Sequence, residues 1–376
     1  MQVNKVFKVI KVIQYHKKFL KIIATHNFHY YIIVLKNGNY NQLPQENNSI
    51  SVKGKYQIYQ NQIEIIADEL TVLKADYKKK FDSLQAEKNQ RLYIRSEATK
   101  QVYRILTEKG LLPVQSPTIT SKWVKGNTNP FKISYYGKER FLSISNMVYH
   151  QLMISNGMSD IFELGKLHRE ELSSGKMKLS EFTTLDISRS FCQIDDICSL
   201  FEELIIELWL SLSKIDLLNL TLIEEVRFDR INYQDLLKKS GQKSFTGSQL
   251  PAKCRNYLQT NFSSFVWVTN FDVRKRPFYT KSYNGISIDA QLWYRGKQYF
   301  AAGSEIETDI EKILDNMNIR GNDPKLYREY LSSMKNGFPP MAMIGMGFEM
   351  LLSHLFKESF TIDYAYFPRV EHGDFF

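Results

Sequence analysis

The period of the hydrophobic pattern changes once along this sequence, and the change divides the chain in two. From about residue 4 to residue 73, apolar and polar residues alternate in short runs that are separated by turn signals such as Asn37-Gly38. Alternation with a period of two is typical of half-buried strands, and five such runs in this length indicate a small barrel. We expect an OB-fold-like all-β barrel over residues 1–74 and a linker over residues 75–90.

The rest of the chain combines the helical period with strands in no regular order. Helices are expected near 88–110, 146–156, 194–213, 305–318, 323–336 and 346–356, and strands near 131–145, 161–168, 181–192 and 286–303. Strands without regular βαβ alternation favour an α+β domain with an antiparallel sheet flanked by helices. We expect this domain to occupy residues 91–376.

Composition narrows the class of protein. Hydrophobic residues make up 43% of the 376 residues and aromatic residues 13%, which is enough for a sizeable core. The N-terminal segment alternates apolar and basic residues, so we expect strands there and not a signal peptide. Cys192, Cys198 and Cys254 have neither metal-ligand spacing nor the even number of a disulfide framework. We expect a cytoplasmic protein without a membrane span.

The formal charge of +10 at pH 7 has two explanations. Clustered Lys and Arg attract phosphate, so the charge suits a nucleotide or nucleic-acid partner. Abundant Lys, Asn, Ile and Tyr together are also what low-GC coding produces. Charge alone leaves both explanations open.

The segment HREELSSGKMKLSEFTTLDI, residues 168–187, carries the main functional signal. It resembles motif 2 of the class II aminoacyl-tRNA synthetases. The resemblance implies that Arg169 binds the α-phosphate of ATP and the attacking carboxylate, because a guanidinium offers a rigid fork of donors. It also implies that Glu171 accepts from the adenine amino group and that Phe182 stacks under the ring. Lys176, in the polar loop, is assigned to the same nucleotide.

Further segments resemble the aspartyl/asparaginyl branch of that family, over nearly the whole chain. Residues 95–120 resemble motif 1, whose proline, here Pro117, lies at a homodimer interface in the family. IGMGFEMLLSHLF resembles motif 3 and contains Gly347, which is assigned to the nucleotide. ESFTIDYAYFPR resembles the end of asparaginyl enzymes, and the barrel matches a subgroup whose OB-fold reads the anticodon. The resemblance implies a homodimer, ATP and Mg²⁺ as cofactors, and AMP-forming ligase chemistry.

The nucleotide and metal positions depart from the family's pattern. Met350 stands where motif 3 has an arginine over the adenine, and is either an apolar lid or a core residue. The position of the Mg²⁺-binding glutamate holds Gln298 or Tyr299, and neither has the charge that a hard cation prefers. Asp289 is the candidate for an upstream metal ligand. Glu305 is a candidate for metal or substrate contact, or else a charge at a helix start.

The expected amino-acid pocket departs further. Lys125 and Met147 replace a glutamate and a glutamine that contact the substrate's ammonium group in the family. His150 and Ile306 replace a Lys and an Arg that hold the side-chain carboxylate of aspartate. Because a buried charge without a partner is costly, we expect a substrate without a free α-amino group, or with an anionic or acylated group there. The alternative is that Lys125 points to solvent from a loop.

The barrel contains basic and aromatic residues close together in sequence, namely Lys17, Lys18, Lys21, Phe28, Tyr30 and Tyr31. Exposed aromatic rings among lysines suit the stacking of single-stranded RNA bases. In the alternative interpretation, Phe28 and Tyr30 fill the barrel interior and the lysines are solvated.

Three functions follow from these observations. The first is an AMP-forming ligase that activates a carboxylic acid and passes it to an acceptor other than cognate tRNA. The second is a functional asparaginyl- or aspartyl-tRNA synthetase with divergent details, against which the pocket changes weigh. The third is a catalytically silent dimeric scaffold, nucleotide sensor or RNA binder, which the loss of the motif 3 arginine and a metal glutamate favours.

Overall fold

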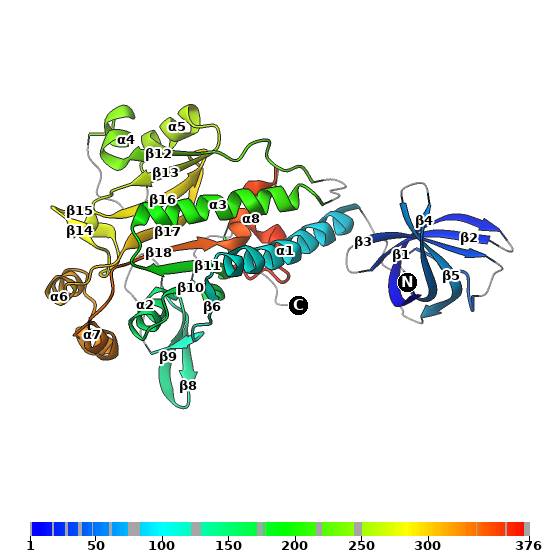
Figure 1. Cartoon of the computed structure of the whole chain (residues 1–376), viewed down its shortest axis with the longest axis horizontal. Helices are drawn as coiled ribbons and strands as arrows, with labels where there is room; N and C mark the ends of the chain where they lie inside the picture. Colours follow the sequence, from blue (N-terminus) through cyan, green and yellow to red (C-terminus); the bar gives the residue numbers. More distant parts are fainter. Residues whose placement is uncertain are drawn as a thin grey trace. The chain divides into compact units, whose positions relative to one another are not determined.

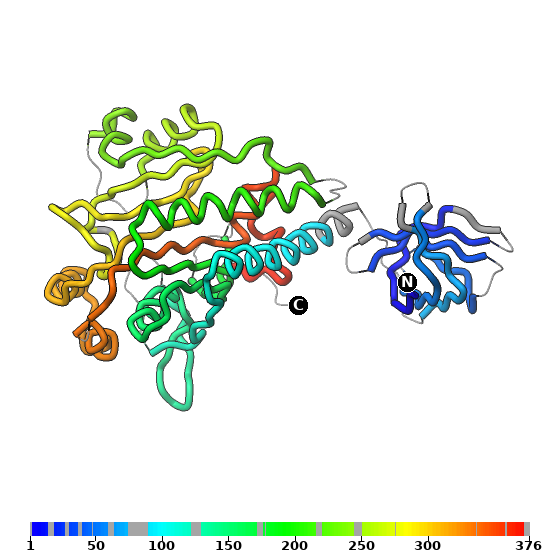
Figure 2. Tube along the Cα trace, in the orientation of Figure 1, coloured from blue at the N-terminus to red at the C-terminus, as the bar shows by residue number. Residues whose placement is uncertain are grey.

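The computed structural model describes residues 2–371 except for 17–18, 27–28, 37–39, 47, 60–61, 74–82, 122–128, 171–175, 177, 216–219, 244–249, 336 and 358. The chain divides into two compact units, Met1–Ile94 and Arg95–Phe376. Figure 1 labels the helices and strands, and Figure 2 traces the backbone in the same orientation. The expected hairpin turn at Asn37-Gly38 lies outside the described residues.

The first unit is a closed five-stranded barrel of β1 (Gln2–His16), β2 (Phe19–His26), β3 (His29–Lys36), β4 (Ser49–Tyr59) and β5 (Gln62–Leu73). The strand order is β1-β2-β3-β5-β4, and β4 pairs with β1 to close the ring. The β3–β5 pair is parallel, and the other pairs are antiparallel. The OB-like barrel expected from the alternating pattern is confirmed.

A glycine permits a close approach of backbone between β4 and β5. The β4–β5 pairing shifts register between Lys53 and Gly54. A Cβ atom on Gly54 would lie 2.2 Å from the carbonyl oxygen of Ile66, which no side chain could tolerate. Glycine at this bulge therefore lets β4 bend while it remains paired with β5.

Tyr31, and not Tyr30, packs against the core of the barrel. Tyr31 packs edge-on against the buried Phe7, with ring centroids 5.4 Å apart, whereas Tyr30 is 39% exposed. The interpretation that placed Tyr30 inside is therefore wrong, because the strand's alternation has the opposite phase. Lys21 forms an ion pair with Glu64 at 3.0 Å. Lys17, Lys18 and Phe28 lie outside the described residues.

The second unit is built on an eight-stranded sheet in the order β12-β13-β16-β17-β18-β11-β10-β6. Its strands are β6 (Leu112–Pro113), β10 (Asp160–His168), β11 (Glu181–Ser190), β12 (Phe228–Asn232), β13 (Phe265–Thr269), β16 (Asp289–Tyr294), β17 (Gln298–Glu305) and β18 (Met341–Gly347). Neighbours are antiparallel except for the pairs β12–β13 and β10–β6. The α+β class with an antiparallel sheet is confirmed.

Two small sheets flank this one. The first has the order β7-β9-β8 and consists of β7 (Ile119–Thr120), β8 (Lys132–Tyr135) and β9 (Lys138–Leu142). The second is the hairpin of β14 (Ser282–Tyr283) and β15 (Ile286–Ser287).

The α-helices of the described residues are α1 (Ser83–Glu108), α2 (Met147–Ser155), α3 (Ile194–Leu212), α4 (Tyr233–Lys239), α5 (Ala252–Asn261), α6 (Ile310–Ile319), α7 (Arg328–Lys335) and α8 (Phe348–Leu355). Short 3₁₀ turns are η1 (Val273–Lys275), η2 (Pro324–Tyr327) and η3 (Thr361–Tyr364). Helix α3 packs on β11, β16, β17 and β18, and α8 packs on β11 and β18 (Figure 1). Among the described helices, none is long and apolar enough to cross a membrane.

The helix expected from residue 305 begins five residues later, at Ile310. Asp309 is its N-cap, and the side chain accepts from the backbone N–H groups of Glu311 and Lys312. Glu305 is instead the last residue of β17. The N-cap residue Asp309 therefore indicates the start of this helix better than the hydrophobic pattern does.

Candidate active site

A cavity of about 1070 Å³ opens on the sheet of the second unit. It is lined from strands β11, β16, β17 and β18, from the start of α2, and from the segment around η1. Of the site residues expected from the sequence, it brings together Met147, Arg169, Phe182, Asp289, Ile306, Gly347 and Met350. It does not include His150, Lys176 or Glu305 among its lining residues.

Arg169 is fixed at the cavity by its strand and by a backbone carbonyl. It directly follows β10, and its backbone N–H donates to Ser180 across the β10–β11 hairpin at 2.9 Å. Its Nε and Nη2 donate to the carbonyl oxygen of Ile144 at 3.4 and 3.3 Å. The guanidinium carbon lies 5.0 Å from the centroid of the Phe182 ring. This arrangement presents a preoriented cation beside an aromatic face.

Glu349 connects three elements at the cavity wall. Its carboxylate accepts from the Arg95 guanidinium at 2.9 Å and from the backbone N–H of Thr183 at 2.9 and 3.1 Å. Arg95 also donates to the Tyr364 carbonyl and the Thr183 hydroxyl, both at 2.7 Å. Both charged side chains are buried. The pair joins α1, β11 and α8 and so positions Gly347 and Met350 at the cavity.

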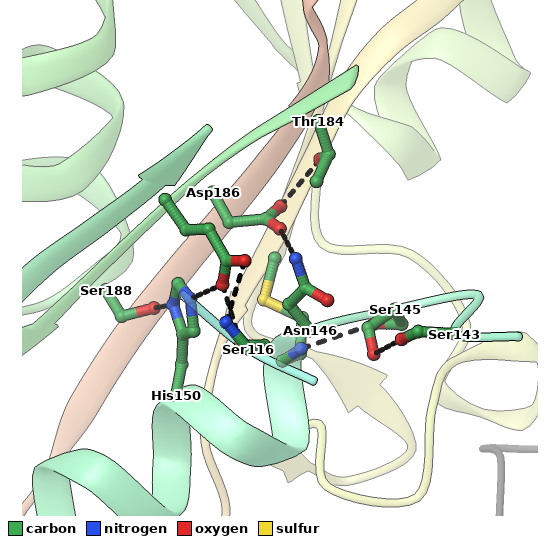
Figure 3. Close-up of polar contacts among 10 residues, drawn as sticks. Ser116, Ser143, Ser145, Asn146, His150, Thr184, Asp186 and Ser188 are labelled. Atoms are coloured by element: carbon green, nitrogen blue, oxygen red, sulfur yellow. Dashed lines mark hydrogen bonds and ion pairs between the residues drawn. The ribbon is translucent and has the colours of Figure 1, made fainter. Parts of the chain in front are cut away.

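Asp186 is a buried acid on the cavity wall that the sequence reasoning did not select. Figure 3 shows it between Thr184, which donates at 2.9 Å, and the amide of Asn146, which donates at 3.4 Å. It forms no ion pair with a described residue, and burial raises its pKa from 3.8 to about 6. Its spacing from Phe182 could have indicated it, because alternate residues of a strand point to the same face. Phe182, Thr184 and Asp186 share the face of β11 that lines the cavity.

Met147 shares this part of the cavity with Asp186. A Cβ atom on Gly345 would lie 2.4 Å from Asp186 Oδ1 and 2.7 Å from Met147 Cε, so glycine is required there. Met147, Ile306 and Met343 belong to one hydrophobic cluster. This part of the cavity combines the Asp186 carboxylate with an apolar surface. Met147 provides a thioether where the family has the amide of a glutamine.

His150 lies behind this wall, so its expected substrate contact is not supported. The ring is fully buried, and Nδ1 lies 2.8 Å from the Ser188 hydroxyl (Figure 3). Nε2 lies 3.0 Å from Glu163 Oε2. Glu163 also accepts from the backbone N–H and the hydroxyl of Ser116 at 2.9 and 2.6 Å. Burial favours the neutral form of Glu163, but the hydrogen bonds from His150 and Ser116 have the larger combined effect. The pKa of Glu163 is therefore lowered. Both ring nitrogens of His150 are thus occupied by the protein.

Two other expected residues also lie away from the cavity. Glu305 accepts from Lys281 at 2.8 Å and from the backbone N–H of Ile194, the first residue of α3, at 3.3 Å. Its carboxylate therefore sits at a helix N-terminus, though of α3 and not of the helix that follows it in sequence. Lys176 places its ammonium 4.7 Å from the Phe360 ring centroid. The expected substrate role of Glu305 and nucleotide role of Lys176 are not supported by this geometry.

Met350, Glu171 and Lys125 complete the expected set. Met350 is half-buried on the cavity wall, whereas its neighbours on both sides, Glu349 and Leu351, are buried. It is therefore a lining residue and not simply core. Glu171 and Lys125 lie outside the described residues.

Asp289 does not have the surroundings of a metal ligand. Oδ1 accepts from the backbone N–H of Phe271 at 3.0 Å and from the Ser287 hydroxyl at 2.5 Å. Oδ2 lies 2.6 Å from Arg276 Nε in a largely buried ion pair. The described residues contain no set of three acidic, His or Cys groups arranged to hold a metal ion. Because Mg²⁺ requires available oxygen ligands, these residues do not fit it.

Basic residues dominate the cavity surface. The acidic lining residues are Asp186, Asp289 and Glu349, and the basic ones are Arg169, Lys178, Arg255, Arg274, Arg276, Lys297 and Arg320. Low-dielectric walls concentrate the field of such a set, so the cavity favours an anionic ligand.

The second unit therefore combines an antiparallel sheet with Arg169 on the β10–β11 hairpin and Glu349 on α8 around one basic cavity. The sequence profile described as tRNA synthetases class II (D, K and N) matches residues 73–371. The chain belongs to this family.

Similar proteins come from the aspartyl and asparaginyl branch. The chain is 26% identical over 340 residues to an aspartate–tRNA(Asp/Asn) ligase of Methanopyrus kandleri, covering 84% of this chain and 79% of that protein. It is 25% identical over 291 residues to the corresponding ligase of Archaeoglobus fulgidus, covering 74% and 67%. The fold matches asparaginyl-tRNA synthetase of Pyrococcus horikoshii complexed with asparaginyl-adenylate, with a TM-score of 0.81, 21% identity and coverage of 99% and 95%.

Proposed function

We propose that the second unit binds ATP and activates a carboxylic acid as an acyl-adenylate. In this reaction a carboxylate oxygen attacks the α-phosphorus, the bond to the β-phosphate breaks and pyrophosphate leaves. The acyl group then passes to a nucleophilic acceptor and AMP is released. We infer an acceptor other than cognate tRNA.

The observation that carries this proposal is the geometry of Arg169. Its guanidinium is held at the cavity by the Ile144 carbonyl and lies over Phe182. A fixed guanidinium can bind an α-phosphate and an attacking carboxylate together, and positioning with charge neutralisation is most of what this chemistry needs. The similar structure from Pyrococcus horikoshii contains asparaginyl-adenylate, which supports the same class of intermediate here.

The surroundings of Asp186 indicate the class of acid. Asp186 forms no ion pair with a described residue, and the nearby Met147, Ile306 and Met343 are apolar. Ile306 offers no charge to an aspartate side chain, and His150 is occupied by Glu163 and Ser188. We infer a substrate with an apolar side chain and a hydrogen-bond-donating group directed at Asp186. This inference differs from the expectation of a substrate without an amino group, because Asp186 can accept a hydrogen bond from such a group.

A second candidate is a catalytically silent nucleotide-binding protein. It is favoured by Met350, which replaces a phosphate-binding cation with a thioether, and by the ion pair that occupies Asp289. The two candidates share ATP binding and differ in turnover.

Calorimetric titration with ATP tests the shared step. Arg169→Ala should weaken the binding of ATP or a non-hydrolysable acyl-adenylate analogue by about 1.5–3 kcal/mol, the worth of a charge-assisted bond. Arg227→Ala is the matched control, because Arg227 is an exposed arginine that does not line the cavity. Equal affinities for the two variants would show that Arg169 does not contact the nucleotide. No ATP binding by the wild type would exclude both candidates.

A further inference from the structure

The carboxylates on the cavity wall are already bound by protein donors. Asp289 accepts two hydrogen bonds on one oxygen and pairs with Arg276 on the other. Glu349 pairs with Arg95 and accepts from a backbone N–H group. An ion that replaced either set of donors would leave a buried guanidinium without its partner, which is strongly unfavourable.

Asp186 does not complete a metal site. It lies beside Met147 Cε and accepts from a hydroxyl and an amide. Among the described residues, Asp186 belongs to no set of three acidic, His or Cys groups that could hold an ion. Gln298 and Tyr299, one of which occupies the expected glutamate position, line the cavity without a negative charge. The donor set therefore does not fit Mg²⁺.

The cavity supplies positive charge from side chains instead. Arg276 places its guanidinium 4.0 Å from the Phe271 ring centroid, and its Nη2 is buried without a hydrogen-bond partner among the described residues. Arg255 and Lys297 line the cavity with exposed side chains and form no ion pair within the described part of the chain. Arg255 and Lys297, together with the unbonded Nη2 of the Asp289-paired Arg276, can therefore donate charge-assisted hydrogen bonds to phosphate oxygens.

We propose that the phosphates of ATP in this cavity are neutralised by Arg255, Arg276 and Lys297 without a bound magnesium ion. This inference rests on the proposed ATP binding. The side chains replace both the missing metal carboxylate and the arginine that motif 3 lacks at Met350. Because free ATP carries more negative charge than its magnesium complex, a cavity of this kind should bind free ATP at least as tightly as MgATP.

Calorimetric titration of the full-length protein with ATP, in EDTA and in saturating magnesium chloride, tests this inference. We expect the dissociation constant in EDTA to be equal to or lower than that in magnesium. Binding that is more than about tenfold weaker in EDTA, a difference of about 1.4 kcal/mol, would overturn the inference and leave the proposed function standing. No binding in either solution would overturn the proposed function itself.

A pair of double variants locates the charges responsible. Arg255→Ala/Lys297→Ala should weaken ATP binding in EDTA roughly tenfold, since each exposed pairing contributes a modest amount. AMP binding should change less, because AMP lacks the outer phosphates, and retained AMP binding also shows that the variant folds. Lys238→Ala/Lys239→Ala removes the same charge from the exposed end of α4, away from the cavity, and should leave both affinities unchanged. Equal losses in the two double variants would mean that only net charge matters, which contradicts the inference.

Discussion

At the residue scale, the buried Asp186 lowers the protein's free energy of unfolding at neutral pH. Burial raises its pKa from 3.8 to about 6, so the folded protein binds this proton more tightly than the unfolded chain. The group's contribution to the free energy of unfolding is fully present below pH 3.8 and is lost as pH rises through about 6. A buried acid kept at this cost on a cavity wall is typical of a functional group.

Asp186→Asn should therefore stabilise the protein at pH 8 and have little effect near pH 4. The gain in the free energy of unfolding at pH 8 is at most about 3 kcal/mol, from the size of the pKa shift. Thermal unfolding of wild type and variant across this pH range checks the sign. Asp235→Asn, at an exposed position of α4 that does not line the cavity, serves as the control for the loss of one carboxylate. A difference that does not depend on pH would contradict the assignment of the shifted pKa to Asp186.

At the element scale, the Arg95–Glu349 pair joins α1 to β11 and α8. Arg95→Met should destabilise the second unit by about 3–5 kcal/mol, because it leaves the buried Glu349 without its cation. The matched control lies on the same helix. Arg104 forms an exposed pair with Glu108, and Arg104→Met should cost only about 0.3–0.5 kcal/mol. Urea unfolding compares the two, and similar losses would show that the buried pair does not anchor these elements.

Elements with a clear period were predictable, and contacts between elements were not. The alternation in the barrel strands and the periodicity of α1 and α3 are local properties, so the sequence predicts their positions to within a few residues. Arg169 and Phe182 could be selected because their motif lies on one hairpin. Other contacts join residues that only the fold brings together. Examples are the Asp289–Arg276 ion pair and the contact of His150 with Glu163. Hence the metal and substrate roles were the weakest predictions.

At the scale of the whole molecule, we expect a homodimer formed through the motif 1 segment. Apolar side chains remain exposed there, on α1, β6 and β7, namely Tyr103, Leu112 and Ile119. An isologous interface usually covers such a surface. Light scattering at micromolar concentration should give the mass of a dimer. Leu112→Asp should shift it toward monomer, whereas Leu210→Asp, at an exposed apolar position of α3, should not. A monomeric wild type would refute this expectation.

We propose that this chain activates a carboxylic acid other than free aspartate or asparagine. ATP–pyrophosphate exchange across a panel of amino acids and other carboxylic acids measures activation directly, independently of the acceptor. We predict exchange with an acid that has an apolar side chain and a hydrogen-bond donor, loss of that exchange in Arg169→Ala, and none above background with aspartate or asparagine. Exchange with aspartate or asparagine alone would identify an ordinary synthetase of this family, and ATP binding without exchange for any acid would identify a silent one; either result would contradict the account.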